Sequence, residues 1–335
     1  MLELGFSISS EEHPANELVR QAKSAENAGF SFAMISDHFH PWTHQQGNSP
    51  FVWSVLGAIA AVTDRIRIGT AVTCPTVRIH PGIIAQAAAT TASMMPGRFM
   101  LGLGSGENLN EHIFGARWPA PGVRIEMLEE AVVVIKRLWR GGWHNHAGKH
   151  YTLENACIFS LPEQPPPILI AAASERAARM AGRVGQGLVC TQPNPKTVAA
   201  FEDAGGRGKP RYGQLTVCWA RSEDDAIKTA IEIWPNAAIT GQATTELPLP
   251  LHFEQLAEMV TRESIAQSVI CGPDARRHIE ALREFERAGF DHVFVHQIGH
   301  QQAEFIDFYR SEVMPELGRA DSRDSSIHAS VEHGA

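Results

Sequence analysis

Residues 32–42 read FAMISDHFHPW, an apolar run that passes directly into a polar and aromatic stretch containing a proline. The continuously apolar part, residues 32–35, is typical of a strand buried on both faces. Residues 36–42 then form the loop that leaves the carboxyl end of this strand. A carboxylate, two imidazoles and an indole lie within six residues of this loop. This combination suits a site that handles protons beside a flat conjugated ring.

Apolar strands and helical patterns alternate along the rest of the chain. Eight strands are predicted, over residues 4–9, 32–35, 66–72, 99–104, 168–172, 187–190, 214–220 and 292–296. Most are continuously apolar and helices separate them, which predicts a parallel (β/α)8 TIM barrel. A doubly wound sheet is the alternative fold, but no Gly-x-Gly-x-x-Gly follows the first strand.

The predicted organisation is one barrel domain over residues 1–318, with insertions near residues 141–166 and 235–260. The first insertion is rich in His and Pro, and we expect it to be an irregular surface excursion. Residues 319–335 contain many Ser, Asp and His but almost no apolar side chains, which predicts a disordered tail.

Composition excludes several classes of protein. The 335 residues carry a net charge of −8 without a basic block, which argues against nucleic-acid binding. No apolar run approaches the roughly 20 residues that span a bilayer, and no basic stretch precedes the first strand as in a signal peptide. The five cysteines are scattered without paired spacing, which predicts reduced thiols in a cytoplasmic protein.

Functional groups of a barrel lie on the loops that follow its strands. His38 is a candidate general base with Asp37 beside it, because imidazole titrates near neutral pH. The alternatives are a hydrogen-bonded structural role for His38 and a place in the core, instead of a ring-stacking wall, for Trp42. Other polar candidates on these loops are Glu11, Glu12, His13, His40, Thr73, Cys74, Thr76, Glu107, Asn110, Ser174, Thr191, His296, Gln297 and His300.

Two of these loops have features that suit a ligand. Glu107 follows closely spaced glycines at 102, 104 and 106, which permit close approach of the backbone. Glu107 could instead be an ordinary carboxylate at a helix N-terminus. Residues 171–174 lead into a helix start whose free amides could hold a phosphate, although a helix capped by Ser174 has the same sequence pattern.

A metal site is the weaker interpretation of the His38-x-His40 spacing, which also resembles the first ligands of barrel hydrolases. Such sites need further ligands at later strand ends, but the fifth strand ends in alanines and the sixth in Cys190 and Thr191. We therefore predict no metal, and we expect Cys74 and Cys190 to be packing residues without an activated thiolate. A non-catalytic barrel that only binds a ligand is a third class.

Four segments together resemble the luciferase-like superfamily, and more closely its branch that uses the 8-hydroxy-5-deazaflavin coenzyme F-420. They are SDHFHPW (36–42), GTAVTCPT (69–76), GLGSGENLNE (102–111) and AGRVGQG (181–187). The resemblance covers residues 4–317 in the same order. It implies a (β/α)8 barrel, usually a homodimer, with the coenzyme at the carboxyl-end mouth. It also implies hydride transfer between a small-molecule substrate's carbinol and carbon 5 of the deazaflavin.

The resemblance also implies roles for individual residues. His38 matches the base that takes the hydroxyl proton, and Trp42 matches the residue that stabilises the reacting centre. Glu107 matches the acid near the deazaflavin ring, and Glu11 matches a second carboxylate.

Further positions match those that hold the coenzyme. Asp37 matches a coenzyme contact, and the Ala71-Val72 bond matches a non-proline cis peptide behind the ring. Positions implied to hold the ring, ribityl chain and phosphate are Cys74, Gly106, Asn110, Ala172, Ala173, Ser174 and Thr191.

The substrate side departs from the phosphosugar dehydrogenases of this branch, which use two lysines and an arginine to bind phosphate. Here the nearest lysine after Thr191 is Lys196, residues 241–260 contain no lysine or arginine, and Arg283 is the remaining cation. Without such cations a phosphate loses charge-assisted hydrogen bonds. We therefore predict a neutral or weakly polar alcohol, or its carbonyl product. The alternatives are a sugar-6-phosphate dehydrogenase that uses Lys196 and Arg283, and an FMN-dependent monooxygenase of the same superfamily.

Overall fold

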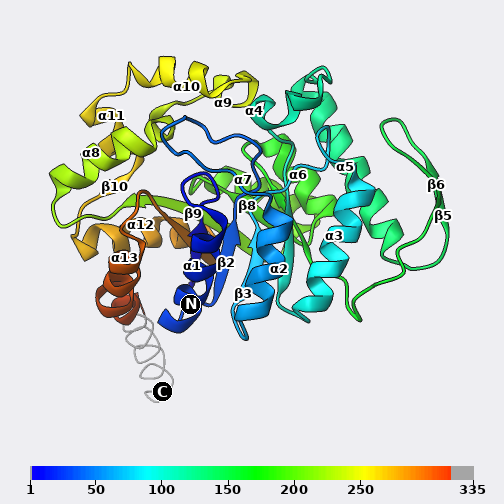
Figure 1. Cartoon of the computed structure of the whole chain (residues 1–335), viewed down its shortest axis with the longest axis horizontal. Helices are drawn as coiled ribbons and strands as arrows, with labels where there is room; N and C mark the ends of the chain where they lie inside the picture. Colours follow the sequence, from blue (N-terminus) through cyan, green and yellow to red (C-terminus); the bar gives the residue numbers. More distant parts are fainter. Residues whose placement is uncertain (1, 318–335) are drawn as a thin grey trace, which may run out of the picture.

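Eight parallel strands close into a barrel in the computed structural model, which describes residues 2–317 (Figure 1). The strands lie in the order β9-β11-β1-β2-β3-β4-β7-β8, and the pairing of β8 with β9 closes the barrel. The predicted (β/α)8 architecture is confirmed. The strand bounds are β1 Glu3–Ile8, β2 Phe32–Ile35, β3 Arg67–Thr70, β4 Phe99–Leu103, β7 Ile168–Ala171, β8 Gly187–Cys190, β9 Arg211–Cys218 and β11 His292–Gln297.

Helices follow the strands and cover the outside of the barrel (Figure 1). Their ends follow local chemistry. Gly29 ends α1 with φ of 95°, and the Ser174 hydroxyl accepts a hydrogen bond from the backbone N–H of Ala177 at the start of α6. The main helices are α1 Ala15–Ala28, α2 Val52–Val62, α3 Pro81–Met94, α5 Pro121–Leu138, α6 Glu175–Val184, α7 Pro195–Phe201, α8 Glu223–Ile233, α12 Ala275–Arg287 and α13 Gln302–Phe308.

The core has two layers. Alternate side chains of the strands point inward and fill the barrel, as the period of two in a strand requires. This inner cluster consists of Phe32, Met34, Met100, Leu169, Val189, Tyr212 and Phe294. The other side chains pack outward against the helices, for example Phe6 and Ile8 of β1 beside Leu18 of α1. Because the strands are buried on both faces, their sequences are continuously apolar.

The first insertion differs from the prediction of an irregular excursion. It contains an antiparallel hairpin, β5 His144–Ala147 and β6 Thr152–Ala156, which stands out from the barrel beside α5 in Figure 1. Tyr151, next to β6, is buried and donates its hydroxyl to the carbonyls of Pro75 and Thr76, both at 3.1 Å. The hairpin region therefore supports the loop that follows β3.

The later part of the chain contains several short elements. They are α4 Asn108–Glu111, α9 Ala243–Glu246, α10 Pro250–Ala257, α11 Arg262–Ser268 and the short strand β10 Ile270–Cys271. Strand β10 was not predicted, and it pairs with β9 outside the barrel closure. The final helix, predicted over residues 301–316, is α13 followed by a wider π-helical turn at Tyr309–Val313. The predicted tail at 319–335 lies outside the described residues.

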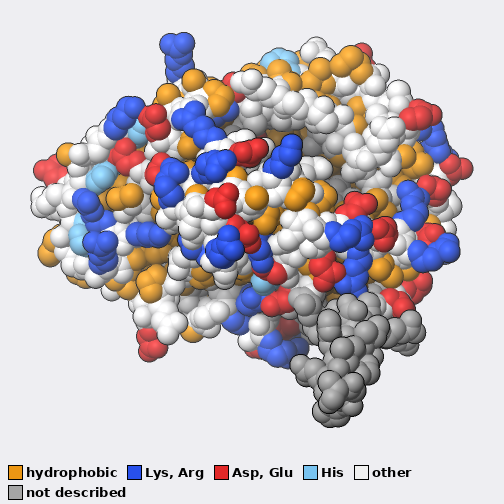
Figure 2. Space-filling model, turned by 180° about the vertical axis from the view of Figure 1, so that it is seen from behind, with side chains coloured by type: hydrophobic (Ala, Val, Ile, Leu, Met, Phe, Trp, Pro, Cys, Tyr) orange, Lys and Arg blue, Asp and Glu red, His pale blue; other side chains and the backbone are white. Residues whose placement is uncertain are grey.

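Among residues 2–317, no helix is long and apolar enough to cross a membrane. Acidic and basic side chains are interspersed on the face of the molecule in Figure 2. The five cysteines are all free thiols.

Candidate active site

The loops after β1 and β2 bring a buried carboxylate against an imidazole. Glu11 Oε1 lies 3.3 Å from His38 Nδ1, and the carboxylate is only 2% exposed. Its other oxygen accepts hydrogen bonds from the hydroxyls of Ser36 at 2.6 Å and Ser9 at 3.1 Å. Burial alone raises the pKa of Glu11, but the His38 charge and the Ser36 hydrogen bond together hold that pKa below its ordinary value. Glu11 is therefore a carboxylate at neutral pH.

The surroundings of His38 fix which ring nitrogen carries the proton. Nδ1 lies 3.3 Å from the backbone carbonyl of His40 and 3.3 Å from the Glu11 carboxylate, and both groups only accept hydrogen bonds. The proton of the neutral ring therefore lies on Nδ1, and Nε2 retains its lone pair. Nε2 has no hydrogen-bond partner among residues 2–317. This arrangement leaves a basic nitrogen available to a ligand.

Trp42 extends the loop into an aromatic wall. The centroid of its ring lies 5.2 Å from the centroid of the His38 ring, at an interplanar angle of 58°. On its other side it meets the buried ring of Phe253, from α10, at 5.1 Å and 81°. This edge-to-face contact joins the loop after β2 to the second insertion. Trp42 is only partly buried, so it belongs to the mouth of the barrel and not to its core.

A buried guanidinium connects three of the loops. Arg78, after β3, contacts Asp37 Oδ1 at 2.9 Å and lies 3.5 Å from Glu111 Oε1 in α4. Asp37 Oδ2 also accepts the hydroxyl of Thr73 at 2.7 Å. Burial lowers the pKa of Arg78, but the charges of Asp37 and Glu111 outweigh burial and raise it above its ordinary value. The Asp37 carboxylate is thus committed to protein partners, although a coenzyme contact was expected for it.

Glu107 occupies a different environment from that of Glu111. Burial raises the pKa of Glu111, and the nearby charge of Glu107 contributes to the same direction. Glu107 precedes α4 but makes no capping hydrogen bond to it, and its side chain forms no ion pair within residues 2–317. The alternative of an ordinary carboxylate at a helix N-terminus therefore stays open, and Glu107 is half-buried at the N-cap position of α4.

The loop after β4 has the close packing expected of a ligand cradle. A Cβ atom at Gly106, whose φ is +78°, would lie 2.5 Å from Cys74 Sγ. Burial raises the pKa of Cys74 well above its ordinary value, so this side chain is a neutral thiol that packs. Asn110 Oδ1 accepts the backbone N–H groups of Phe39 and His40 at 2.8 and 3.0 Å. Its Nδ2 is buried without a partner in the described chain, and a ligand acceptor could satisfy this donor.

The peptide bond between Ala71 and Val72 is cis, as the resemblance implied. It follows β3 directly, at the carboxyl end of the barrel. Gly104 lies against it, since a Cβ there would come within 2.5 Å of Val72 Cγ2. The absence of a side chain at residue 104 therefore permits this packing.

The positions expected to hold the ribityl chain and phosphate lie on the opposite side of the mouth. Ala172 is buried, whereas Ala173 and Ser174 are exposed at the start of α6, and Thr191 is exposed after β8. The structure gives the Thr191 side chain no partner among residues 2–317. These residues share the carboxyl end of the barrel with the Glu11–His38 pair, but they form no side-chain network with it.

The two candidate substrate cations are not brought together. Lys196 is exposed in the first turn of α7, near the mouth, and only its backbone N–H has a partner, Asn194 Oδ1. Arg283 lies eight residues into α12, about 12 Å from the helix start. Its guanidinium contacts Glu286 at 2.5 Å and the carbonyl of Leu317 at 3.3 Å. Arg283 is therefore engaged by protein partners, and its substrate role stays a prediction.

A second carboxylate–imidazole pair was not assigned from the sequence. Glu12 Oε2 lies 3.0 Å from His296 Nε2, at the end of β11, and both side chains are buried. The Trp234 ring packs on His296 at 4.4 Å. Beside them, burial lowers the pKa of His13, whose ring lies 5.8 Å from that of His300. The sequence showed polar residues at the ends of these strands. It did not show that Glu12 and His296, which are 284 residues apart, form a pair.

The described residues contain no group of three or more His, Cys, Asp or Glu side chains that could hold a metal ion. His38 Nδ1 faces Glu11, while His40 Nδ1 lies 2.9 Å from the carbonyl of Leu109. The two imidazoles therefore serve different partners.

Comparisons with known proteins agree with this geometry. The model of the family described as luciferase-like monooxygenase matches residues 3–292. F-420-dependent glucose-6-phosphate dehydrogenase from Microbacterium testaceum is 35% identical, over 94% of this chain and 97% of its own. The enzyme of the same name from Beutenbergia cavernae is 34% identical, over 97% of this chain and 100% of its own.

Solved structures extend the comparison. An F-420-dependent secondary alcohol dehydrogenase in complex with an F-420-acetone adduct has a TM-score of 0.87 at 27% identity, over 94% of this chain and 98% of that chain. The F-420-dependent tetrahydromethanopterin reductase from Methanopyrus kandleri has a TM-score of 0.74 at 21% identity, over 94% and 99%, and shares the fold. The family model alone spans most of the barrel, and this chain therefore belongs to the luciferase-like family.

Proposed function

We propose that this chain is an F-420-dependent oxidoreductase that transfers a hydride between a neutral alcohol, or its carbonyl product, and carbon 5 of the deazaflavin. The observation that carries the proposal is the Glu11–His38 pair beside the Trp42 wall. The names of relatives at 34 and 35% identity support the coenzyme. The Asn110 donor and the close packing at Gly106 fit a bound planar ligand.

When bound, the coenzyme supplies the hydride acceptor or donor, and the side chains manage the proton. His38 Nε2, with its lone pair, accepts the hydroxyl proton as the alcohol is oxidised. Glu11 holds Nδ1–H at 3.3 Å and stabilises the imidazolium that results. Trp42 and Phe253 exclude water from one side of this base. Glu107, in its protonated form, would donate the second proton near the ring and would take a proton back from water.

The substrate assignment depends on charge. The second insertion packs the buried Phe253 behind Trp42 and contains no lysine or arginine over residues 241–260. Arg78, which is close to the site, is already neutralised by Asp37 and Glu111. A phosphate at this surface would lack paired charge, whereas an uncharged substrate gains from apolar contact. The similarity to a secondary alcohol dehydrogenase, at 27% identity, supports the same substrate class.

The second candidate function is a sugar-6-phosphate dehydrogenase. The relatives at 34 and 35% identity, which are named as glucose-6-phosphate dehydrogenases, favour glucose 6-phosphate. Lys196, which is exposed in the first turn of α7 near the mouth, is the cation that we assign to it.

A screen of coenzyme reduction separates these candidates. Purified protein is mixed with F-420 and either sugar phosphates or neutral secondary alcohols, and loss of the oxidised coenzyme's absorbance is followed. We expect turnover with at least one neutral alcohol and little with glucose 6-phosphate. Efficient turnover of glucose 6-phosphate with every alcohol silent would overturn the substrate assignment. A parallel fluorescence titration with FMN tests the flavin-dependent monooxygenase, which preferential FMN binding would favour.

We also propose a cytoplasmic homodimer. Exposed apolar side chains gather on two helices that pack together, with Val62 at the end of α2 and Ile83 and Met94 on α3. Such a patch marks an association surface. Sedimentation of the wild type should give a dimer and Ile83→Asp should give a monomer, whereas a monomeric wild type would refute the dimer. The five free thiols fit a reducing compartment.

A further inference from the structure

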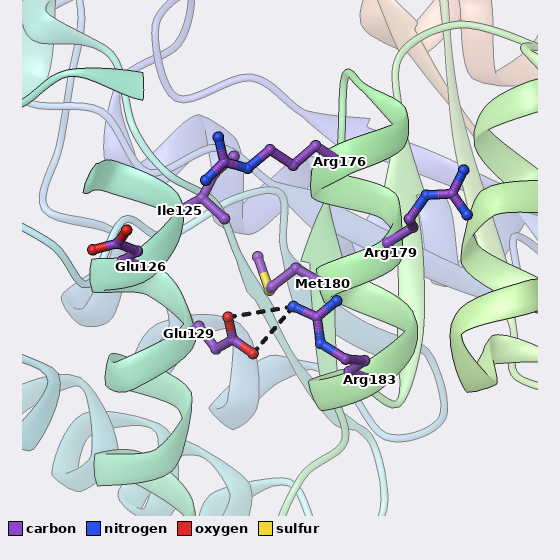
Figure 3. Close-up of a pocket in the computed structure, with 7 residues that line it drawn as sticks. All are labelled: Ile125, Glu126, Glu129, Arg176, Arg179, Met180 and Arg183. Atoms are coloured by element: carbon purple, nitrogen blue, oxygen red, sulfur yellow. Dashed lines mark hydrogen bonds and ion pairs between the residues drawn. The ribbon is translucent and has the colours of Figure 1, made fainter. Parts of the chain in front are cut away.

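A pocket of about 390 Å³ lies outside the barrel, between α5 and α6 (Figure 3). Its apolar floor is formed by Ile125 and Met180, one from each helix. The remaining residues that line it are charged, namely Glu126 and Glu129 from α5 and Arg176, Arg179 and Arg183 from α6. None of these side chains takes part in the site around His38.

The arginines differ in how far their charge is neutralised. Arg176 reaches from α6 toward α5 above Ile125 in Figure 3, and it has no hydrogen bond or ion pair among residues 2–317. Arg183 is joined to Glu129 by a 3.3 Å contact that is exposed on both sides. Arg179 points away from the pocket in Figure 3 and pairs with Glu175. Arg176 is therefore the cation whose charge is free for a ligand.

The other charges of the lining leave Arg176 available to an anion, because Arg183 already contacts Glu129. The carboxylate of Glu126, which projects from the far side of α5 in Figure 3, already contacts Lys149 at 2.6 Å. The negative charges of the lining are thus matched by other cations.

The pocket begins at the rim of the barrel mouth. Helix α6 starts directly after β7, and Arg176 is its second residue, close to Ser174. Arg183 lies seven residues further along the helix, about 10 Å away. That distance matches roughly three extended residues of a peptide-like chain. An extended anionic ligand that leaves the mouth over α6 would run along this groove.

We propose that the groove between α5 and α6 binds the acidic tail of the coenzyme, with Arg176 as its principal contact. F-420 differs from FMN in carrying, beyond its phosphate, a chain of glutamate residues with one carboxylate each. The guanidinium of Arg176 pairs with a tail carboxylate, and the methylene groups of the tail lie on Ile125 and Met180. The proposal rests on the coenzyme proposed above, and it adds a binding site outside the barrel mouth.

The test compares two forms of the coenzyme by fluorescence titration. One form is F-420 with several glutamates, and the other carries the phospholactyl group without glutamate. Arg176→Ala should weaken binding of the long form about fivefold, the effect of one exposed charge pair, and leave the short form unchanged. Arg140→Ala, at an exposed arginine just beyond the far end of α5 and outside the pocket lining, is the matched control and should change neither. Added salt should reduce the preference of the wild type for the long form.

A second variant tests the sign of the effect. Glu129→Gln releases Arg183 from its partner, so it should tighten binding of the long form and not that of the short form. If the wild type binds both forms with equal affinity, or if Arg176→Ala weakens both equally, the tail site is wrong and the coenzyme assignment stands. If the wild type binds neither form, the coenzyme proposal and the tail site both fail.

Discussion

The two sides of the barrel mouth are built differently. After β1 to β4, the polar side chains of Glu11, Asp37 and Glu111 are almost fully buried, and each contacts a partner from another loop. After β7 and β8, Ser174, Thr191 and Lys196 are exposed and make no comparable contacts. The first side is preorganised, so contacts within the protein fix its geometry without a ligand. The second side must obtain its specificity from the ligand that binds there.

The largest expected effect is on the first side, at the base. His38→Ala should lower turnover by about 10²–10⁴-fold, because proton transfer is lost, while coenzyme affinity stays nearly constant. His44→Ala is the matched control, since His44 is an exposed histidine of the same loop that pairs with an exposed Glu254. Steady-state rates and coenzyme titrations measure both variants. Parallel loss of binding and turnover in His38→Ala would mean that His38 is structural.

Arg78 should matter most for stability. Arg78→Met leaves the buried charges of Asp37 and Glu111 without their partner, and we expect it to lower the free energy of unfolding by about 3–5 kcal/mol. Urea denaturation of the purified protein measures this change. Lys196→Met is the control from the exposed side and should leave the unfolding midpoint unchanged. Similar urea midpoints for Arg78→Met and Lys196→Met would show that the buried network stabilises the fold no more than the exposed side does.

Glu11 should produce a pH-dependent difference. The pKa of Glu11 in the folded state lies below its unfolded value of about 4.3, so its ionised form stabilises the fold above that pH. This contribution is lost as pH falls through the lower, folded pKa. The difference in free energy of unfolding between wild type and Glu11→Gln should therefore be largest at roughly pH 6 to 7. It should narrow below about pH 4. A gap that is constant over this range would contradict the lowered pKa.

The smallest effect is expected on the exposed side. Lys196→Ala should change kcat/KM for a neutral alcohol by less than about twofold, because its side chain contacts nothing in residues 2–317. The same assay with a sugar phosphate serves as the comparison. A large loss with the sugar phosphate alone would show that Lys196 holds a phosphate after all.

The same difference explains what the sequence could predict. The eight strands, the cap at Gly29 and the cis bond at Ala71-Val72 follow from local patterns or from a contiguous motif. The contact of Arg78 with Asp37 joins residues 41 apart, and that of Glu12 with His296 joins residues 284 apart. Such pairs leave no periodic signal in the chain, so only the folded barrel brings them together.

The differences from the prediction had a similar cause. The resemblance offered Arg283 as a substrate cation, but in the structure its guanidinium contacts Glu286 and the carbonyl of Leu317. The hairpin of β5 and β6 lacks an apolar run, since the partly buried His144 and His146 of β5 alternate with the exposed Asn145 and Ala147. The link of this region to the loop after β3, from Tyr151 to Thr76, joins residues 75 apart in the sequence.

The central claim is hydride transfer from a neutral alcohol to the coenzyme. A secondary alcohol that carries deuterium on its carbinol carbon is incubated with the protein and oxidised F-420, and the reduced coenzyme is analysed by mass spectrometry. We predict that the reduced coenzyme gains one deuterium atom, and that His38→Ala slows its appearance without changing the label. Reduced coenzyme without deuterium, or no reduction by any secondary alcohol, would contradict the claim.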